Sequence, residues 1–213
     1  MSDEEAGPGR NLLIDRDRGR PPQFYFDLFS PTAYLAAERV LAVVPGPCPW
    51  VPILARSLPA AESFEAYRCE TDMLAARDVI ERRARALGLQ EFVWPSPFPF
   101  DSARAMLAAT YAGQIGKGVA FALAAFRQAF AGGHTLSVDD NIVIAGAACE
   151  IHPRALLKAL DAASVRAELE RATAQALALG VSDVPAVRIG DRVLVGEGQL
   201  EQAGELLSPA SRT

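Results

Sequence analysis

Residue types that carry much of protein chemistry are scarce in this chain. Its 213 residues include three cysteines and two histidines. Cys48, Cys69 and Cys149 lie far apart, without a C-x-x-C pair and without a histidine at metal-ligand spacing. We therefore expect neither structural disulfides nor a metal site.

Long apolar segments and concentrated positive charge are also missing. No stretch approaches about 18 consecutive apolar residues, and the N-terminus lacks the basic and apolar regions of a signal peptide. We therefore expect a cytoplasmic protein without membrane contact. The formal net charge of −5 and the lack of a basic face argue against nucleic acid as a partner. Half of the residues are hydrophobic, so a sizeable core can form.

The two ends of the sequence carry the pattern of an α/β core. Residues 1–21 mix charge, glycine and proline, which predicts a disordered leader. Residues 23–28 are apolar and aromatic enough for a buried strand, and 31–44 suit a helix. A second strand is predicted at 50–54, where Pro52 requires a sheet edge or a bulge.

The middle of the sequence is helical. Helices are predicted at 72–87, 102–112, 115–131, from an N-cap at Ser137 to 149, at 153–163 and at 164–179. Strands at 186–189 and 192–195 then flank Gly190-Asp191, a two-residue turn signal, and a helix at 199–207 closes the chain.

This order of elements predicts an α/β, thioredoxin-like fold (β-α-β … β-β-α) with a large α-helical insertion. The core comprises residues 22–58 and 181–213, and the insertion comprises 59–180.

Ser30 stands between the first strand and the first helix. Its side chain can cap the helix, while Pro31 takes a position where a missing N–H has no cost. This capping role is a complete explanation of the residue on spacing alone. The alternative is a reactive position, because thioredoxin-like folds place their reactive group at this junction.

Four motifs carry a resemblance to a known family. They are FYFDLFSPTAYLA at 24–36, FPFDSARA at 98–105, GVSDVPAV at 180–187 and G-x-x-x-L at 196–200. Together they resemble the DsbA-like branch of the thioredoxin superfamily, and most closely the 2-hydroxychromene-2-carboxylate isomerases and kappa-class glutathione transferases. The resemblance covers about residues 22 to 208.

The resemblance implies a glutathione-dependent isomerase or transferase. Ser30 would donate a hydrogen bond to the glutathione thiolate at the helix N-terminus. The Val184 backbone, before a cis Pro185, would hold the peptide part of glutathione. Ser30-Pro31-Thr32-Ala33 contains no cysteine, so thiol-disulfide exchange through a C-x-x-C motif is excluded.

The chain departs from the relatives at the glutamyl end of glutathione. Relatives show Gly-x-Asp-Arg after the hairpin, whereas this chain has Gly196-Glu197-Gly198-Gln199. Glu197, Gly198 and Gln199 are the candidates for this part of the site. Asp183, where a glycine is usual, adds a negative charge near the expected thiolate.

An electrophilic, aromatic substrate would lie against Phe29, Tyr34, Trp94 and Phe98, for which core packing is the alternative. The resemblance also implies a homodimer. Two other functions stay open. One is a non-catalytic or divergent protein that binds a thiol compound or a peptide at the Val184-Pro185 edge, and the other is a redox protein that uses one of the three cysteines.

Overall fold

The computed structural model describes residues 20–60 and 70–208. The predicted leader before residue 20 and Cys69 lie outside these residues. Four strands form one mixed sheet in the order β2-β1-β3-β4. The strands are β1 (Gln23–Phe26), β2 (Trp50–Pro52), β3 (Ala186–Ile189) and β4 (Arg192–Val195).

Strand pairing explains the position of Pro52. β1 pairs with β2 in parallel and with β3 antiparallel, so β2 lies at a sheet edge. A proline there interrupts no second ladder, because the outer side of an edge strand has no partner strand. At the other edge, Ile189 pairs with Arg192 across the predicted Gly190-Asp191 turn.

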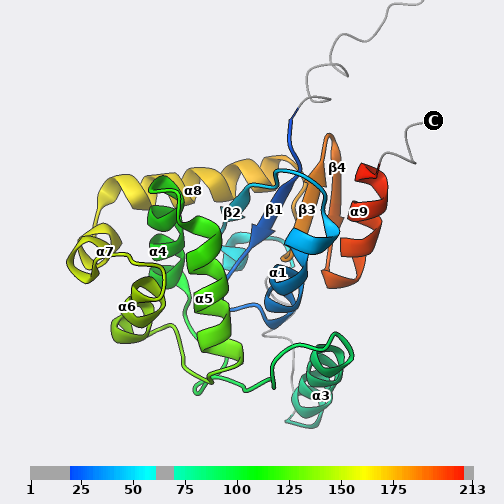
Figure 1. Cartoon of the computed structure of the whole chain (residues 1–213), viewed down its shortest axis with the longest axis horizontal. Helices are drawn as coiled ribbons and strands as arrows, with labels where there is room; N and C mark the ends of the chain where they lie inside the picture. The colour runs from blue at the N-terminus through cyan, green and yellow to red at the C-terminus, as the bar shows by residue number, and fades with distance from the viewer. Residues whose placement is uncertain (1–19, 61–69, 209–213) are drawn as a thin grey trace, which may run out of the picture.

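Eight α-helices are present in the described part of the chain, some packed on the sheet and others on helices alone (Figure 1). They are α1 (Pro31–Val43), α3 (Glu70–Ala86), α4 (Ala103–Gln114), α5 (Gly118–Phe130), α6 (Asp139–Ala147), α7 (Pro153–Leu160), α8 (Ala163–Ala178) and α9 (Leu200–Leu207). Short 3-10 helices η1 (Ala55–Ser57) and η2 (Glu197–Gln199) complete the structure. The predicted α/β, thioredoxin-like fold with a helical insertion is confirmed.

Successive side chains of β1 point alternately into two apolar layers, one on each face of the sheet. Phe24 and Phe26 point into the larger cluster, where they meet α1 and α5, and Phe26 lies 5.8 Å from the ring of Phe126. Tyr25 faces the opposite layer with Ile53 and residues near the end of α8. The period of two places helices on both faces of the sheet, as buried strands require.

Several predicted element boundaries differ from the structure by two or three residues, and the starts of α6 and α5 have a clear physical reason. Ser137 does not cap α6, because Val138 occupies the N-cap position and the Ser137 hydroxyl lies 2.9 Å from that of Thr135. α5 begins at Gly118 instead of 115, because the chain turns at Gly116 with a φ of 74°. Among the described residues, no helix has the length and apolar character needed to cross a membrane.

Candidate functional site

Ser30 caps α1 and is almost fully buried. Its Oγ accepts a hydrogen bond from the Ala33 N–H at 3.2 Å, and Tyr34 N–H donates to the Ser30 carbonyl. The hydroxyls of Ser30 and Thr32 lie 3.1 Å apart. Either hydroxyl can be the donor of this pair; when Thr32 donates to Ser30, the Ser30 hydrogen is available for a ligand, and when Ser30 donates, it is not.

The Val184-Pro185 segment lies at the same end of the sheet as Ser30. The register pairs Tyr25 with Ala186, so its continuation brings Pro185 beside Phe26. α1 starts from this end of β1, and the Val184-Pro185 peptide bond is cis. Ser30 and Val184, 154 residues apart in the chain (184 − 30), are thus brought to one end of the sheet by the antiparallel pairing of β1 with β3.

The Val184 N–H is already engaged. It donates to Oδ1 of Asp183 at 2.7 Å, and Val184 itself is 5% exposed. Burial raises the pKa of Asp183, and this hydrogen bond lowers it in part. A peptide-like ligand that uses this N–H must therefore displace the Asp183 carboxylate.

Asp27 is a buried carboxyl directly beneath the junction. Its two oxygens accept from the N–H groups of Phe29, at 3.2 Å, and Ala55, at 2.9 Å. Burial raises the pKa of Asp27 to about 6, against hydrogen bonds from the Ser102 side chain and from both N–H groups. The carboxyl thus joins the turn before Ser30 to the residues after β2.

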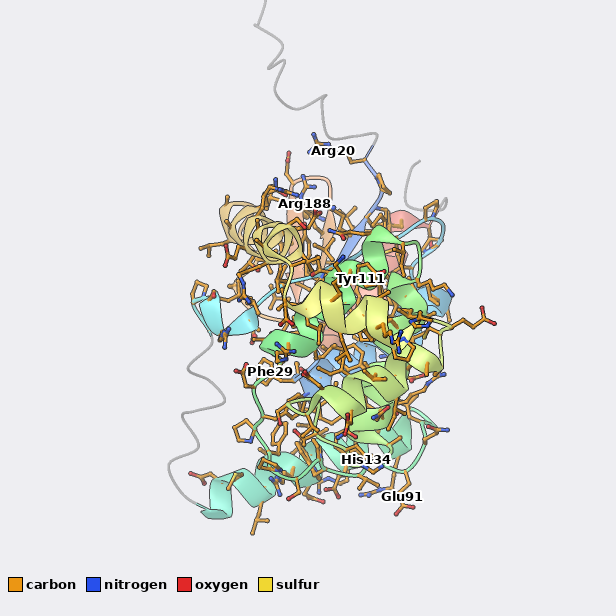
Figure 2. The ribbon with its side chains drawn as sticks, turned by 90° about the vertical axis from the view of Figure 1, so that its left-hand side faces the viewer. Arg20, Phe29, Glu91, Tyr111, His134 and Arg188 are labelled. Carbon is orange, nitrogen blue, oxygen red and sulfur yellow. The ribbon has the colours of Figure 1, made fainter. Side chains whose placement is uncertain are left out.

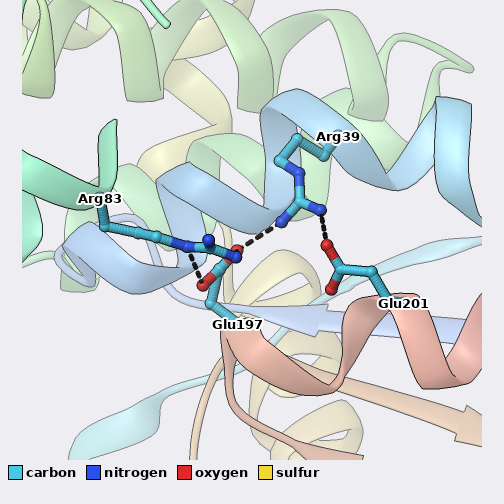
Figure 3. A network of polar contacts seen from close by, with 4 residues as sticks. All are labelled: Arg39, Arg83, Glu197 and Glu201. Atoms are coloured by element: carbon cyan, nitrogen blue, oxygen red, sulfur yellow. Dashed lines mark hydrogen bonds and ion pairs between the residues drawn. The ribbon is translucent and has the colours of Figure 1, made fainter. Parts of the chain in front are cut away.

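Glu197 contacts two arginines (Figure 3). Arg83 of α3 donates from Nε and Nη2 to its two oxygens, each at 3.0 Å, and Arg39 of α1 also donates to it. Arg39 pairs in addition with Glu201 of α9. Gly198 and Gln199 follow Glu197 in η2 and are exposed. Glu197 therefore ties α3 to α1 and η2, and its role toward glutathione stays a prediction.

Trp94 and Phe98 line a cavity of about 20 Å³ against α3, together with Arg77. That volume holds about one water molecule. The Arg77 guanidinium lies 4.9 Å from the centre of the Trp94 ring, and its buried Nε has no hydrogen-bond partner among the described residues. The cavity is thus lined by apolar side chains, two of them aromatic, and by one arginine.

The other two predicted pocket residues lie elsewhere. Tyr34 is 1% exposed and stacks on Phe130 in the core, at 5.7 Å between ring centroids. Phe29 is partly buried and packs against both apolar clusters. Their role toward a substrate stays a prediction.

The two described cysteines lack the properties of reactive thiols. Cys48 and Cys149 are free, and burial raises the pKa of Cys48 to about 11 and also raises that of Cys149. The thiolate is the nucleophile, so neither is activated. Within residues 20–60 and 70–208, no group of side chains could hold a metal ion.

Sequence reasoning missed Asp27 and the engagement of Val184. A single carboxylate in an otherwise apolar run, FYFDLF, is the signal that could have pointed to Asp27, because an unneeded charge is rarely kept in a core. The Asp183 contact depends on a side-chain rotamer, for which the sequence holds no signal.

Comparisons with known proteins agree with the geometry. The family model of the DSBA-like thioredoxin domain matches residues 23–208. A structure of 2-hydroxychromene-2-carboxylate isomerase superposes with a TM-score of 0.77 at 18% identity, over 91% of this chain and 97% of that chain.

Two further structures share the fold. The cytosolic disulfide reductase DsbM from Pseudomonas aeruginosa, determined with GSH, gives a TM-score of 0.60 at 16% identity over 91% of this chain and 100% of that chain. The DsbA disulfide interchange protein from Klebsiella pneumoniae gives 0.52 at 12%, over 97% of both chains. A comparison with curated protein sequences finds no significant match.

Proposed function

Because the chain belongs to the family of DSBA-like thioredoxin domains, we propose that it is a glutathione-dependent isomerase or transferase in which Ser30 stabilises the glutathione thiolate. The observation that carries this proposal is the position of the Ser30 cap at the same end of the sheet as the Val184-Pro185 segment. The Val184 backbone can hold a peptide there while the helix N-terminus faces the sulfur.

The physical basis is the field at the start of α1. A helix N-terminus carries about half a positive charge and favours an anion by roughly 0.3–2 kcal/mol, depending on burial. A free thiol has a pKa of about 8.5, so this field and the Ser30 hydroxyl together raise the thiolate fraction at neutral pH. No cysteine of the protein is needed, because glutathione supplies the sulfur.

Glutathione binding at this edge requires a local rearrangement. The Asp183 carboxylate must leave the Val184 N–H before the ligand backbone can accept from it. An electrophilic, aromatic substrate would lie at the Trp94 and Phe98 cavity, which at about 20 Å³ is too small for an aromatic ring, so α3 must move outward on binding. A homodimer and a cytoplasmic location stay predictions.

The test is calorimetric titration with glutathione, combined with the ultraviolet absorbance of the bound thiolate as a function of pH. We expect binding at millimolar ligand and a thiol pKa below that of free glutathione. Ser30→Ala should reduce the lowering of the thiol pKa, leaving the part due to the helix field, but it also removes a helix cap worth about 1 kcal/mol.

Ser30→Asp separates the two roles of the residue. Aspartate caps helices as well as serine does, and a carboxylate cannot donate to a thiolate and repels it. Ser30 is 2% exposed, so a charge there costs stability, and Ser30→Gly, which costs a cap only a few tenths of a kcal/mol and also lacks a donor, is the matched second variant. Wild-type affinity and thiol pKa in Ser30→Gly would contradict the proposal, as would the absence of any heat or thermal shift with glutathione.

A second function is a divergent protein that binds a thiol compound or peptide at the Val184-Pro185 edge without catalysis. The pairing of Glu197 with Arg39 and Arg83 favours it, because that carboxylate is engaged away from a ligand. Glutathione binding with an unchanged thiol pKa would support this second function over the first.

A further inference from the structure

A second cavity, of about 380 Å³, lies between α8 and the sheet. Gln23, at the start of β1, and Arg188, its partner on β3, line it. Ser30 follows the other end of β1, so this cavity is separate from the candidate site. Figure 2 shows Arg20 and Arg188 near one end of the molecule and Phe29, beside Ser30, well away from them.

The polar residues that line this cavity include two arginines. Arg188 is 4% exposed, and its Nη1 donates to Oε1 of Gln23 at 3.4 Å, an oxygen that also accepts from the Tyr25 hydroxyl at 3.0 Å. Burial raises the pKa of Tyr25, and the charge of Arg188 partly opposes the rise. Arg20 lies at the rim, and none of the described residues that line the cavity is acidic.

The remaining wall is apolar. Val51 of β2 and Leu179, after α8, line it, together with Ala172 and Ala178. A volume of about 380 Å³ falls within the range of small-molecule sites, roughly 300–1,000 Å³. A lining that combines two guanidinium groups with aliphatic side chains suits a ligand with a charged head and an apolar body.

We propose that this cavity is a binding site for a small organic carboxylate. The carboxylate accepts hydrogen bonds from Arg188 and Arg20, whose planar donors match its two oxygens. The apolar body packs against Val51 and Leu179. The site is independent of the proposed glutathione chemistry, because none of its residues belongs to the Ser30 edge.

Carboxylates can reach this cavity from two sources. One is a free small molecule, and the other is the chain itself, because Asp15 and Asp17 precede Arg20 by only a few residues. A tethered carboxylate has an effective concentration in the millimolar range and competes with a free one. The experiment must therefore distinguish the two.

The experiment is a titration of the full chain with benzoate, followed by the backbone amide signals of Tyr25, Val51 and Arg188 in nuclear magnetic resonance. Benzamide, which has the same shape without the charge, is the control ligand. We expect saturable shifts with benzoate below about 10 mM, which corresponds to a dissociation constant near 1 mM, and none with benzamide.

Substitutions that add a charge to α8 give matched variants. Gln175 lines the cavity and is exposed, so Gln175→Lys should tighten benzoate binding and Gln175→Glu should weaken it, each by about threefold or more. Ala174→Glu places the same charge on an exposed residue outside the cavity lining and should have a smaller effect.

The double variant Asp15→Asn/Asp17→Asn identifies the source. Equal benzoate affinity in this variant and the wild type means that a free carboxylate is the ligand. If the variant binds benzoate more tightly than the wild type, and if the two proteins already differ at the same three amides before benzoate is added, the chain's own carboxylates occupy the site. Equal shifts with benzamide, no saturable shift in either protein, or an unchanged affinity in Gln175→Glu would overturn the proposal.

Discussion

Asp27 makes the stability of this protein depend on pH in an unusual direction. Its folded-state pKa of about 6 lies above the ordinary value of 3.8. Between these values the folded state holds more protons than the unfolded state, so the free energy of unfolding falls as pH rises. Two pKa units correspond to about 3 kcal/mol, lost between about pH 4 and pH 6 and constant above.

The measurement is urea denaturation from pH 4 to pH 7 of the wild type and Asp27→Asn. The difference between their unfolding free energies should change across this window, because the variant has no charge to bury. The exposed Asp140→Asn controls for the other carboxyls. A wild-type-to-variant difference that is constant with pH would show that Asp27 does not titrate there.

Asp183 should act as an internal competitor of ligands at the cis-proline edge. Asp183→Ala removes the acceptor of the Val184 N–H, so glutathione affinity should rise by about two- to tenfold, the range of one hydrogen bond. Asp183→Asn keeps an acceptor oxygen and should gain less. Calorimetry compares the three proteins, and an affinity lowered in Asp183→Ala would mean that the carboxylate assists binding.

Single residues mark the limit of sequence interpretation. Ser30 and Ser137 had the same N-cap pattern, yet only Ser30 caps its helix. Ser137 instead lies beside the hydroxyl of Thr135, a local contact that competes with capping. Such choices depend on differences near 1 kcal/mol between nearby partners, which residue order alone does not determine.

Among the helices, α3 is joined to the rest of the described chain in part through one carboxylate. The Glu197 side chain is 10% exposed and contacts two arginines, whereas that of Glu201 is 49% exposed and contacts one (Figure 3). Glu197→Gln should therefore lower the free energy of unfolding by about 1–2 kcal/mol. Glu201→Gln should cost about 0.5 kcal/mol or less.

Hydrogen exchange shows which helix each of these two substitutions destabilises. Amides of α3 should lose protection in Glu197→Gln, because Arg83 loses its charged partner, while amides of β1 keep theirs. If Glu197→Gln and Glu201→Gln lowered the free energy of unfolding equally, or if only α9 lost protection, the contacts of Glu197 with the two arginines would have no role in holding α3.

The packing of α9 on α1 depends on a glycine. A Cβ on Gly204 would lie 2.5 Å from the backbone oxygen of Val43, so one of the two helices must shift. Gly204→Ala should therefore destabilise the protein by about 1–2 kcal/mol despite its better helix propensity. Gly113→Ala in α4 meets nothing within 4 Å and should stabilise by about 0.5–1 kcal/mol. Thermal denaturation compares them, and a stabilised Gly204→Ala would contradict the contact.

Whole elements are far easier to predict than their ends. The apolar stripe of residues 115–131 correctly indicated α5, because the burial of Phe126 and Phe130 determines the face of the helix. Its start was misplaced by three residues, since Gly116 in the left-handed region ends the preceding turn there. Periodicity reports burial, whereas a helix end depends on local backbone geometry.

At the scale of the molecule, the fold was predictable and much of the site was not. The order of strands and helices follows from the spacing of apolar residues, which can be read directly from the sequence. The partners of Glu197 come from α1 and α3, which are remote in the chain, so only the packed structure reveals that this carboxylate is engaged.

The pairing of β1 with β3 has a consequence for how the protein is made. Gln23 and Arg188 are 165 residues apart in the chain, with the helical insertion between them. At about 5–20 residues per second, translation leaves one edge of β1 without its neighbour for roughly 8–30 s. During this interval the nascent chain exposes an unpaired strand, so its yield in cells should depend on chaperones that shield such edges.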